Sequence, residues 1–371
     1  MPPSGSSEST TVRTAIDASS RDLRRVDIHP DHWYPLALSH EVERGKAHGV
    51  RFAGEPIVLV RTASGTVFAL EDRCAHRQIP LHHGVVDGDA IRCCYHGWTY
   101  DCTGRCVNIP YAGRGRAPSG VRAYPCREIA GLVFVFPGDP ALADSTPLPQ
   151  LGCAGSTAYK TRHYARDIAC HYSFLHENLM DMNHQFLHRR VMGQMRVRTL
   201  GRRHGHDWVE VDYALAREAG RRPLGEAVVF GQSPQAPSTR GDAMTIRTRY
   251  PYQTLQIHAS DARLVLDLWA AYVPLDRDQR TTRAYGLVSI KRPRVPLLLD
   301  LAWPLVVWFT ERIFQEDRWA VEREQEAHDA QGTDWNREVV PVIRELRSML
   351  RRCGAPPERA PTSTLLPRSS S

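Results

Sequence analysis

Lysine is almost absent from this chain: only three of its 371 residues are lysine, although the formal net charge is +7. Nearly all of the positive charge is therefore arginine, and the arginines are scattered along the sequence. A protein that binds nucleic acid by neutralising phosphates usually gathers lysine and arginine on one face. The composition therefore argues against nucleic acid as a partner.

Long apolar runs and a secretion signal are also missing. The longest apolar run, Pro296–Phe309, is interrupted by Asp300 and Pro304 and is too short to cross a bilayer. The segment Met1–Ser20 is rich in serine and threonine and lacks the basic and apolar regions of a signal peptide. Nine cysteines, an odd number, do not indicate a disulfide scaffold. We expect a protein of the reducing cytoplasm without a transmembrane span.

Changes in composition divide the chain into four parts. Residues 1–25 and 354–371 are polar and lack apolar periodicity, which predicts a flexible lead-in and a flexible tail. Residues 26–145 carry short apolar runs between turn residues, a pattern typical of a small all-β domain. Residues 146–353 follow a proline-rich boundary and mix strand patterns with helix patterns. The sequence therefore predicts an α+β protein with two domains.

Local patterns predict the individual elements. In the first domain, Ile57–Arg61 and Val67–Leu70 flank a short turn and predict a β-hairpin. Further strands are expected at 90–94, 98–101 and 132–136. In the second domain we expect a helix over His171–Arg190, antiparallel strands within 206–214 and 244–292, helical structure from Pro304, and a long charged helix over Glu311–Gln331.

Two short loops in the first domain each offer one thiolate and one imidazole. The first loop holds Cys74 and His76, and the second holds Cys93 and His96. Two cysteines and two histidines can bind a tetrahedral zinc ion, although zinc fingers usually pair Cys with Cys and His with His. A Rieske-type [2Fe-2S] cluster needs two cysteines on one iron and two histidines on the other. The mixed loops favour the Rieske cluster, with zinc as the alternative.

With these motifs the chain resembles a known family, the Rieske non-haem iron oxygenases (the ring-hydroxylating oxygenase α-subunit superfamily). The matching stretches are Asp72–Arg77, Tyr95–Trp98 and the opening His32–Pro35. The resemblance covers nearly the whole chain between the two predicted flexible ends. It implies an N-terminal Rieske domain followed by a catalytic domain of the helix-grip (START-like) type, an antiparallel sheet with helices.

The resemblance also implies how the cluster is held, with Cys74 and Cys93 on the buried iron and His76 and His96 on the outer iron. High-potential Rieske proteins carry two additional cysteines that bridge the two loops. Ile79 and Tyr95 occupy those positions here. The match is therefore to the lower-potential, oxygenase-like centres.

A second candidate site contains Asp181, His184 and His188. On one helix these residues would lie at i, i+3 and i+7 along a single face, where two imidazoles can bind one metal ion. A pair of surface histidines is one alternative. A zinc hydrolase of the H-E-x-x-H type is another, but Gln185 occupies the position of the general base.

The stretch Glu177–His184 matches the E-N-x-x-D-x-x-H motif of the resembling family. This match implies a mononuclear Fe(II) bound by His184, His188 and a distant carboxylate, for which we expect Asp317, with Glu316 as the rival. Many family members space the two histidines by five residues rather than four. The resemblance also implies that Asp181 links a Rieske histidine of one subunit to an iron-ligating histidine of the next, in a head-to-tail homotrimer.

The function that the resemblance implies is that of a terminal oxygenase, nearest to the monooxygenases and O-demethylases. Such an enzyme uses O₂ to hydroxylate, demethylate or desaturate a hydrophobic, cyclic organic substrate. No strand followed by G-x-G-x-x-G is present, so NAD(P)H electrons must arrive through a separate ferredoxin or flavin reductase. Arginines near the cluster loops (Arg73, Arg77 and Arg92) can steer an acidic ferredoxin, although solvated surface charge explains them equally well.

Two alternatives remain open at this point. The chain can be an electron carrier that kept the Rieske domain and lost the iron site. The apolar segment Pro296–Phe314 can cover a substrate tunnel or touch a membrane surface, but we expect it to be a core helix.

Overall fold

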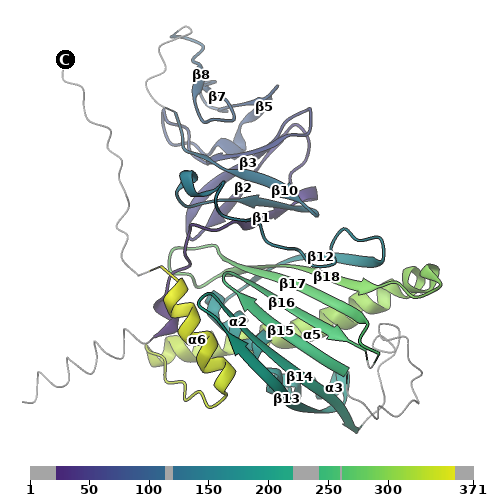
Figure 1. Ribbon diagram of the computed structural model, residues 1–371. Helices are drawn as coiled ribbons and strands as arrows, with labels where there is room; N and C mark the ends of the chain where they lie inside the picture. Colours follow the sequence, from purple (N-terminus) through teal and green to yellow (C-terminus); the bar gives the residue numbers. More distant parts are fainter. Residues whose placement is uncertain (1–21, 113–119, 220–241, 260, 356–371) are drawn as a thin grey trace, which may run out of the picture.

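The computed structural model describes residues 22–112, 120–219, 242–259 and 261–355. These residues form an N-terminal domain of small antiparallel sheets and a second domain built on one large sheet with helices (Figure 1). The predicted α+β class, with the all-β domain first, is therefore confirmed. Most of the expected flexible lead-in and tail lies outside the described residues.

Three antiparallel sheets make up the N-terminal domain. Apolar runs form the buried strands, since every residue of β1 and the four residues Ile57–Val60 of β3 are buried. β3 pairs with β4 in a register that joins Val58 to Leu70, which confirms the predicted hairpin. The sheets have the orders β1-β11-β10, β2-β3-β4-β9 and β5-β6-β7-β8, with the bounds β1 Tyr34–Leu38, β2 Lys46–Phe52, β3 Glu55–Arg61, β4 Val67–Glu71, β5 Val85–Asp87, β6 Ala90–Arg92, β7 Thr99–Tyr100, β8 Cys106–Asn108, β9 Ala123–Tyr124, β10 Cys126–Ile129 and β11 Leu132–Val135.

One seven-stranded antiparallel sheet forms the centre of the second domain, in the order β12-β18-β17-β16-β15-β14-β13. The strands expected within 206–214 and 244–292 are present, and β17 and β18 are almost wholly buried. The sequence pattern does not predict β12 and β13, because arginine, histidine and lysine occupy much of these two edge strands. The bounds are β12 Tyr159–Ile168, β13 Gln194–His204, β14 Trp208–Ala219, β15 Asp242–Arg249, β16 Tyr252–His258, β17 Leu264–Pro274 and β18 Thr282–Lys291.

The helix expected over His171–Arg190 is broken, so this prediction is wrong. Asp181 causes the break, because its backbone is extended and its carboxylate accepts a hydrogen bond from the Asn183 N–H at 2.9 Å. A short polar side chain that bonds nearby backbone competes with continuation of a helix and starts a new turn instead. The three pieces are α2 (Tyr172–Met180), the 3₁₀ helix η5 (Met182–Phe186) and the single turn α3 (Arg189–Met192).

Two longer helices, α5 and α6, belong to the described part of the second domain. α5 (Pro296–Gln331) runs behind the sheet in Figure 1, and α6 (Pro341–Cys353) packs against α2 and β14. The helix expected from Pro304 begins earlier, at Pro296. Pro296 lies in the first turn of the helix, where a backbone N–H has no partner within the helix, so the missing N–H of proline costs no hydrogen bond. Among the helices of the described residues, none combines the length and the apolar character needed to cross a membrane.

The last residues of the expected flexible lead-in are ordered, so that prediction is wrong for residues 22–25. Leu23–Arg25 form a 3₁₀ helix, η1, and the Arg24 side chain is buried against α2, where it pairs with Glu177 at 2.7 Å. An arginine in a polar segment is usually solvated, but here a distant carboxylate compensates its burial. The flexible tail is expected from residue 354, but Ala355 still pairs with Asp27 in a β-bridge.

Hydrogen bonds to backbone oxygens join the two domains. The Ala53 N–H donates to Pro274 O at 2.7 Å, and the Tyr252 hydroxyl donates to Trp33 O at 2.6 Å. These bonds fix the large sheet against the N-terminal domain and leave the sheet β5-β6-β7-β8 at the far end of the molecule (Figure 1).

Candidate metal centres

The two cysteine-histidine loops meet at the far end of the N-terminal domain. Cys74 follows β4 and Cys93 lies between β6 and β7, and both thiols are buried. A tight turn closes the second loop, since the Gly97 N–H donates to Cys93 O and Gly97 has a φ of +73°. A side chain at this left-handed position would be strained. The turns therefore hold the two sulfurs next to each other inside the domain.

The two imidazoles lie further out and side by side. The ring centroids of His76 and His96 are 4.5 Å apart, and His76 stacks on Trp98 at 4.9 Å with an interplanar angle of 6°. The Nδ1 atom of His76 is buried and has no hydrogen-bond partner. A buried polar atom without a partner is costly unless a bound group satisfies it. Two buried sulfurs beside two outer imidazoles fit the donor set of a Rieske cluster.

Tyr100 adds a contact on the cysteine side that the sequence analysis missed. Its hydroxyl oxygen accepts the Ala75 N–H at 3.0 Å and lies 3.2 Å from Cys74 Sγ. Because the oxygen already accepts from the amide, the hydroxyl hydrogen can point at the sulfur. Hydrogen bonds to the sulfurs are one of the factors that set the reduction potential of an iron–sulfur cluster. No local motif reveals this contact, because Tyr100 reaches Cys74 from another strand.

In the second domain, three side chains converge on one point. The Nε2 atoms of His184 and His188 lie 3.4 Å and 3.1 Å from the same oxygen, Oδ1 of Asp317. Among the described residues, this is the only group of His, Cys, Asp or Glu side chains that can hold a single metal ion, and its three donor atoms lie within 4.8 Å of one another. Nε2 of His188 is also buried without a hydrogen bond of good geometry. The donor set fits a metal with open positions bound by two histidines and one carboxylate.

The opposite nitrogens of both imidazoles are held by other groups. Nδ1 of His184 contacts the backbone oxygen of Asp181, and Nδ1 of His188 lies 2.8 Å from a Glu316 carboxylate oxygen. Metal-binding histidines usually donate their second N–H to a carbonyl or carboxylate in this way, which fixes the ring. Glu316 therefore orients His188 from outside, whereas Asp317 faces the point where the donors meet.

Charge at this point favours a cation. Burial disfavours the protonated imidazole of His188, but the carboxylates of Asp317 and Glu316 outweigh that effect and raise its pKa above the usual value. Asp317 faces Nε2 and Glu316 faces Nδ1, so the negative charge that favours the protonated imidazole would also favour a metal cation at Nε2.

Asp181 and Asn178 lie on either side of the break after α2. The Asn178 amide donates to Asp317 Oδ1 at 3.4 Å, a long contact that joins α2 to the carboxylate of α5. The Asp181 carboxylate accepts from Asn183, and His184 contacts the backbone oxygen of Asp181 rather than its carboxylate. Asp181 itself is half-buried.

A cleft of about 750 Å³ opens beside the three converging side chains, between η5–α3 and α5. Two aromatic side chains, Phe186 and Trp319, line it and are largely exposed. Arg189, Arg190 and Arg312 also line it, and the Arg189 guanidinium lies 4.0 Å from the centre of the Phe186 ring. The lining of the cleft therefore combines aromatic rings with cationic side chains, and it includes His184 and Glu316.

Models of two protein families match this chain. A Rieske [2Fe-2S] domain matches residues 32–125, and a vanillate O-demethylase oxygenase C-terminal domain matches residues 168–353. The first match contains the two cysteine-histidine loops. The second contains His184, His188 and Asp317.

Named relatives and solved structures agree with these matches. The 4β-methylsterol monooxygenase of Methylococcus capsulatus is 32% identical over 333 residues, which cover 83% of this chain and 84% of that protein. The oxygenase component of dicamba O-demethylase from Stenotrophomonas maltophilia is 39% identical over 42% of this chain and 47% of its own length. The crystal structure of dicamba monooxygenase bound to dicamba has the same fold, with a TM-score of 0.73 over 88% of this chain and 98% of that chain, at 24% identity.

Proposed function

This chain belongs to the Rieske non-haem iron oxygenases, and we propose that it is the terminal component of a multicomponent system that oxidises a hydrophobic, cyclic compound. A Rieske [2Fe-2S] cluster and a non-haem iron are the cofactors that this membership implies. O₂ is the proposed co-substrate. NAD(P)H is the proposed electron source, acting through a separate ferredoxin or flavin reductase.

The convergence of His184, His188 and Asp317 on one point carries the proposal. These residues would hold the mononuclear iron, which supplies the redox chemistry that activates O₂ when it is bound. The chain's own contribution is to orient the ligands, through the Asp181 carbonyl on His184 and the Glu316 carboxylate on His188. An electron carrier needs none of these residues, so the geometry favours the oxygenase over the carrier.

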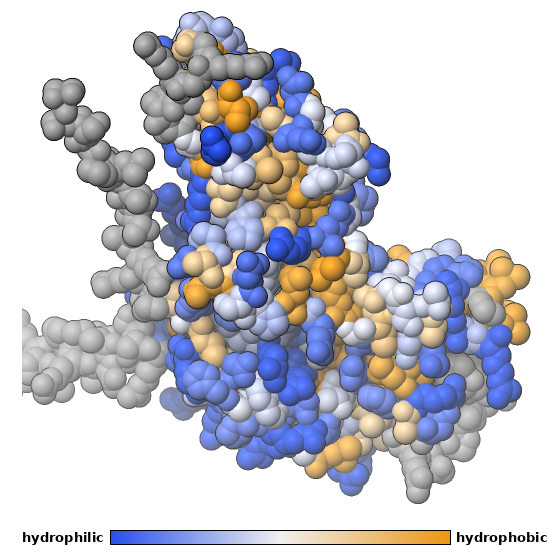
Figure 2. Space-filling view, turned by 45° about the horizontal axis from the view of Figure 1, so that its top comes forward, coloured by the Kyte–Doolittle hydropathy of each residue, from blue (hydrophilic) through white to orange (hydrophobic). Residues whose placement is uncertain are grey.

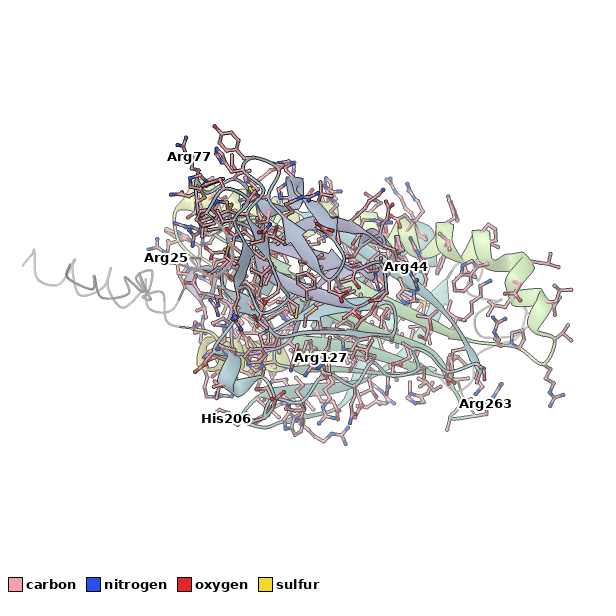
Figure 3. The ribbon with its side chains drawn as sticks, turned by 90° about the horizontal axis from the view of Figure 1, so that it is seen from above. Arg25, Arg44, Arg77, Arg127, His206 and Arg263 are labelled. Atoms are coloured by element: carbon pink, nitrogen blue, oxygen red, sulfur yellow. The ribbon has the colours of Figure 1, made fainter. Side chains whose placement is uncertain are left out.

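In the N-terminal domain, Cys74 and Cys93 would hold the buried iron of the cluster, and His76 and His96 the outer one. The imidazoles are the outermost ligands, which suits electron transfer to a partner at that end of the molecule. Of the three arginines expected to steer a ferredoxin, Arg73 and Arg92 are paired with Glu71 and Asp87. Arg77 points outward at this end (Figure 3), so the proposed steering rests mainly on Arg77.

The two sites lie in different domains, so electrons must pass from one to the other. We propose that Asp181 serves this transfer across a homotrimer, joining an outer cluster histidine of one subunit to His184 of its neighbour. The support is that Asp181 is half-buried and that its carboxylate accepts hydrogen bonds from the neighbouring Asn183 rather than from His184.

For the substrate we propose a polycyclic or sterol-like compound. The support is the relative that covers most of this chain, whose name specifies a methylated sterol. The shorter matches include O-demethylases of aromatic compounds, so oxidation of a methyl group is the shared chemistry. The proposed reaction is therefore hydroxylation of a methyl or ring carbon, or removal of a methyl group.

A turnover assay tests this function. The purified chain is supplied with a surrogate ferredoxin and reductase, NADH and a panel of sterols and methoxyaromatic acids, and product, NADH and O₂ are followed. His184→Ala should abolish product while the visible absorption of the cluster stays intact. His204→Ala, which alters an exposed histidine of β13, is the matched control and should keep full activity. Turnover by the His184→Ala variant would disprove the assignment of the iron site.

A further inference from the structure

The N-terminal half of α5 is apolar on two sides but covered on only one. Leu299, Val306 and Phe309 are buried against the domain. Five large apolar side chains beside them are exposed to more than half of their surface: Val295 (55%), Leu297 (63%), Leu298 (58%), Leu301 (71%) and Trp308 (59%). The expectation that Pro296–Phe314 is simply a core helix is therefore wrong for one of its sides. Exposed apolar groups of this size mark a surface that something else covers.

Three of the five exposed residues form a stripe along one face of α5. Leu297, Leu301 and Trp308 follow one another at helical spacing, so they share a face roughly opposite Val306. This end of α5 extends past the strands at the right of Figure 1, and Figure 2 shows apolar side chains gathered there at the edge of the molecule. The stripe is therefore convex and accessible along a projecting helix end.

Positive charge surrounds the stripe. Residues 291–310 contain one acidic residue, Asp300, and three basic ones, Lys291, Arg292 and Arg294. Asp300 is neutralised by Lys160 at 2.6 Å and Arg292 at 3.1 Å. Beyond Trp308, the next exposed position on the same face is Arg312. The patch is thus apolar at its centre and cationic at both ends.

We propose that this stripe, formed by Leu297, Leu301 and Trp308, rests on the surface of an anionic lipid bilayer. A helix with leucine and tryptophan on its exposed face and arginine at its margins is suited to lie in the headgroup region, where the aromatic ring and the cations both find partners. The opposite side of the helix, which carries Val306, is buried against the domain, so the proposed contact involves only one face of α5.

A second copy of this chain fits the stripe less well. A symmetric pairing would bring the exposed Arg294 and Arg312 close to their own copies, and the one acidic residue of 291–310, Asp300, is already paired with Lys160 and Arg292. An anionic surface meets those charges with the opposite sign. Charge complementarity therefore selects the lipid.

The inference deepens the proposed function, on which its biological meaning rests. α5 also carries Asp317, which follows Leu301 on the same helix at a distance of about 24 Å for a rise of 1.5 Å per residue. A bilayer contact at Leu301 would place the proposed iron site near the membrane in which a sterol-like substrate dissolves.

Vesicle sedimentation tests the inference with the full-length holoenzyme. Vesicles of phosphatidylcholine alone are compared with vesicles that contain phosphatidylglycerol, at low and high salt. The wild-type chain should bind the anionic vesicles and release as salt rises, since surface charges are screened. A Leu297→Gln/Leu301→Gln/Trp308→Gln variant should lose binding by about tenfold or more, because each substitution removes an apolar group from the lipid contact.

The matched control is Trp335→Gln/Val339→Gln, which alters two equally exposed apolar side chains outside α5. The control should bind as the wild type does. Absence of wild-type binding, or equal loss in both variants, would overturn the inference. So would a change of oligomeric state in the α5 variant alone, measured by light scattering, because a second copy would then cover the stripe. Vesicle binding is measured independently of turnover. A chain that oxidises substrate but does not bind vesicles would contradict only this inference. A chain that binds vesicles but shows no turnover would contradict only the proposed function.

Discussion

Removal of the Arg24 side-chain charge should destabilise the second domain far more than removal of the charge of Arg25, the next residue along the chain. The Arg24 side chain is fully buried, with its guanidinium 2.7 Å from Glu177 Oε2 and 3.5 Å from the centre of the Phe174 ring. Arg24→Met keeps the aliphatic stem but leaves the Glu177 carboxylate, 13% exposed, with one partner fewer. Breaking a buried ion pair from one side costs about 3–5 kcal/mol.

The cost should lie near the lower end of that range. Arg347 Nε remains 3.0 Å from the other Glu177 oxygen, so the carboxylate keeps a cationic partner. A loss of about 3 kcal/mol corresponds to a fall in apparent Tm of about 6 °C or more for a domain of this size. Arg25→Met is the matched control, because the Arg25 side chain is 54% exposed and should cost less than about 0.5 kcal/mol.

Thermal unfolding followed by circular dichroism measures both variants. A double-mutant cycle with Glu177→Gln then isolates the pair, and its coupling energy should exceed about 1 kcal/mol. Equal Tm values for the Arg24 and Arg25 variants would refute the idea that the N-terminal segment is fixed to α2 by a buried ion pair.

Two further predictions concern the cluster and the response to acid. Tyr100→Phe removes the hydroxyl that lies 3.2 Å from Cys74 Sγ. The midpoint potential of the cluster should fall by about 20–60 mV, which is the free energy of one hydrogen bond expressed for a one-electron couple. An unchanged potential in a spectroscopic redox titration would contradict this. Burial of His176 lowers the pKa of its imidazole to about 3 in the folded protein. Below pH 6.5 the imidazole therefore binds a proton in the unfolded chain but stays neutral in the folded one. Stability should therefore fall as pH drops from 6.5, by up to about 1.4 kcal/mol per pH unit from this group, and His176→Leu should show a shallower decline of Tm between pH 6.5 and 5. Parallel declines in both proteins would exclude His176 as a cause.

The sequence was most informative where a site is local. Each cluster loop places a cysteine and a histidine within four residues, so the donor set can be identified without the fold, and the β-hairpins around it follow from apolar runs. Asp317 lies far from His184 along the chain, and only the family resemblance singled it out. The structure brings Asp317 and the two histidines together, and Asp317 and Glu316 face different nitrogens of His188.

The failures share a physical reason, because each depends on contacts between distant segments or on competition within the backbone. Asp181 looks compatible with a helix, yet its carboxylate bonds the Asn183 amide and breaks the helix. Arg24 looks solvated until Glu177 is placed beside it. The contact of Tyr100 with Cys74 depends on the pairing of short strands, which no periodic pattern encodes.

The metal content of the purified chain tests the central claim most directly. Elemental analysis combined with acid-labile sulfide should give about three irons and two sulfides per chain, two irons in the cluster and one at His184, His188 and Asp317. Asp317→Ala should retain about two irons and the visible spectrum of the cluster, because Asp317 lies in the other domain. A wild-type chain with only two irons, or with zinc in place of iron, would contradict the account.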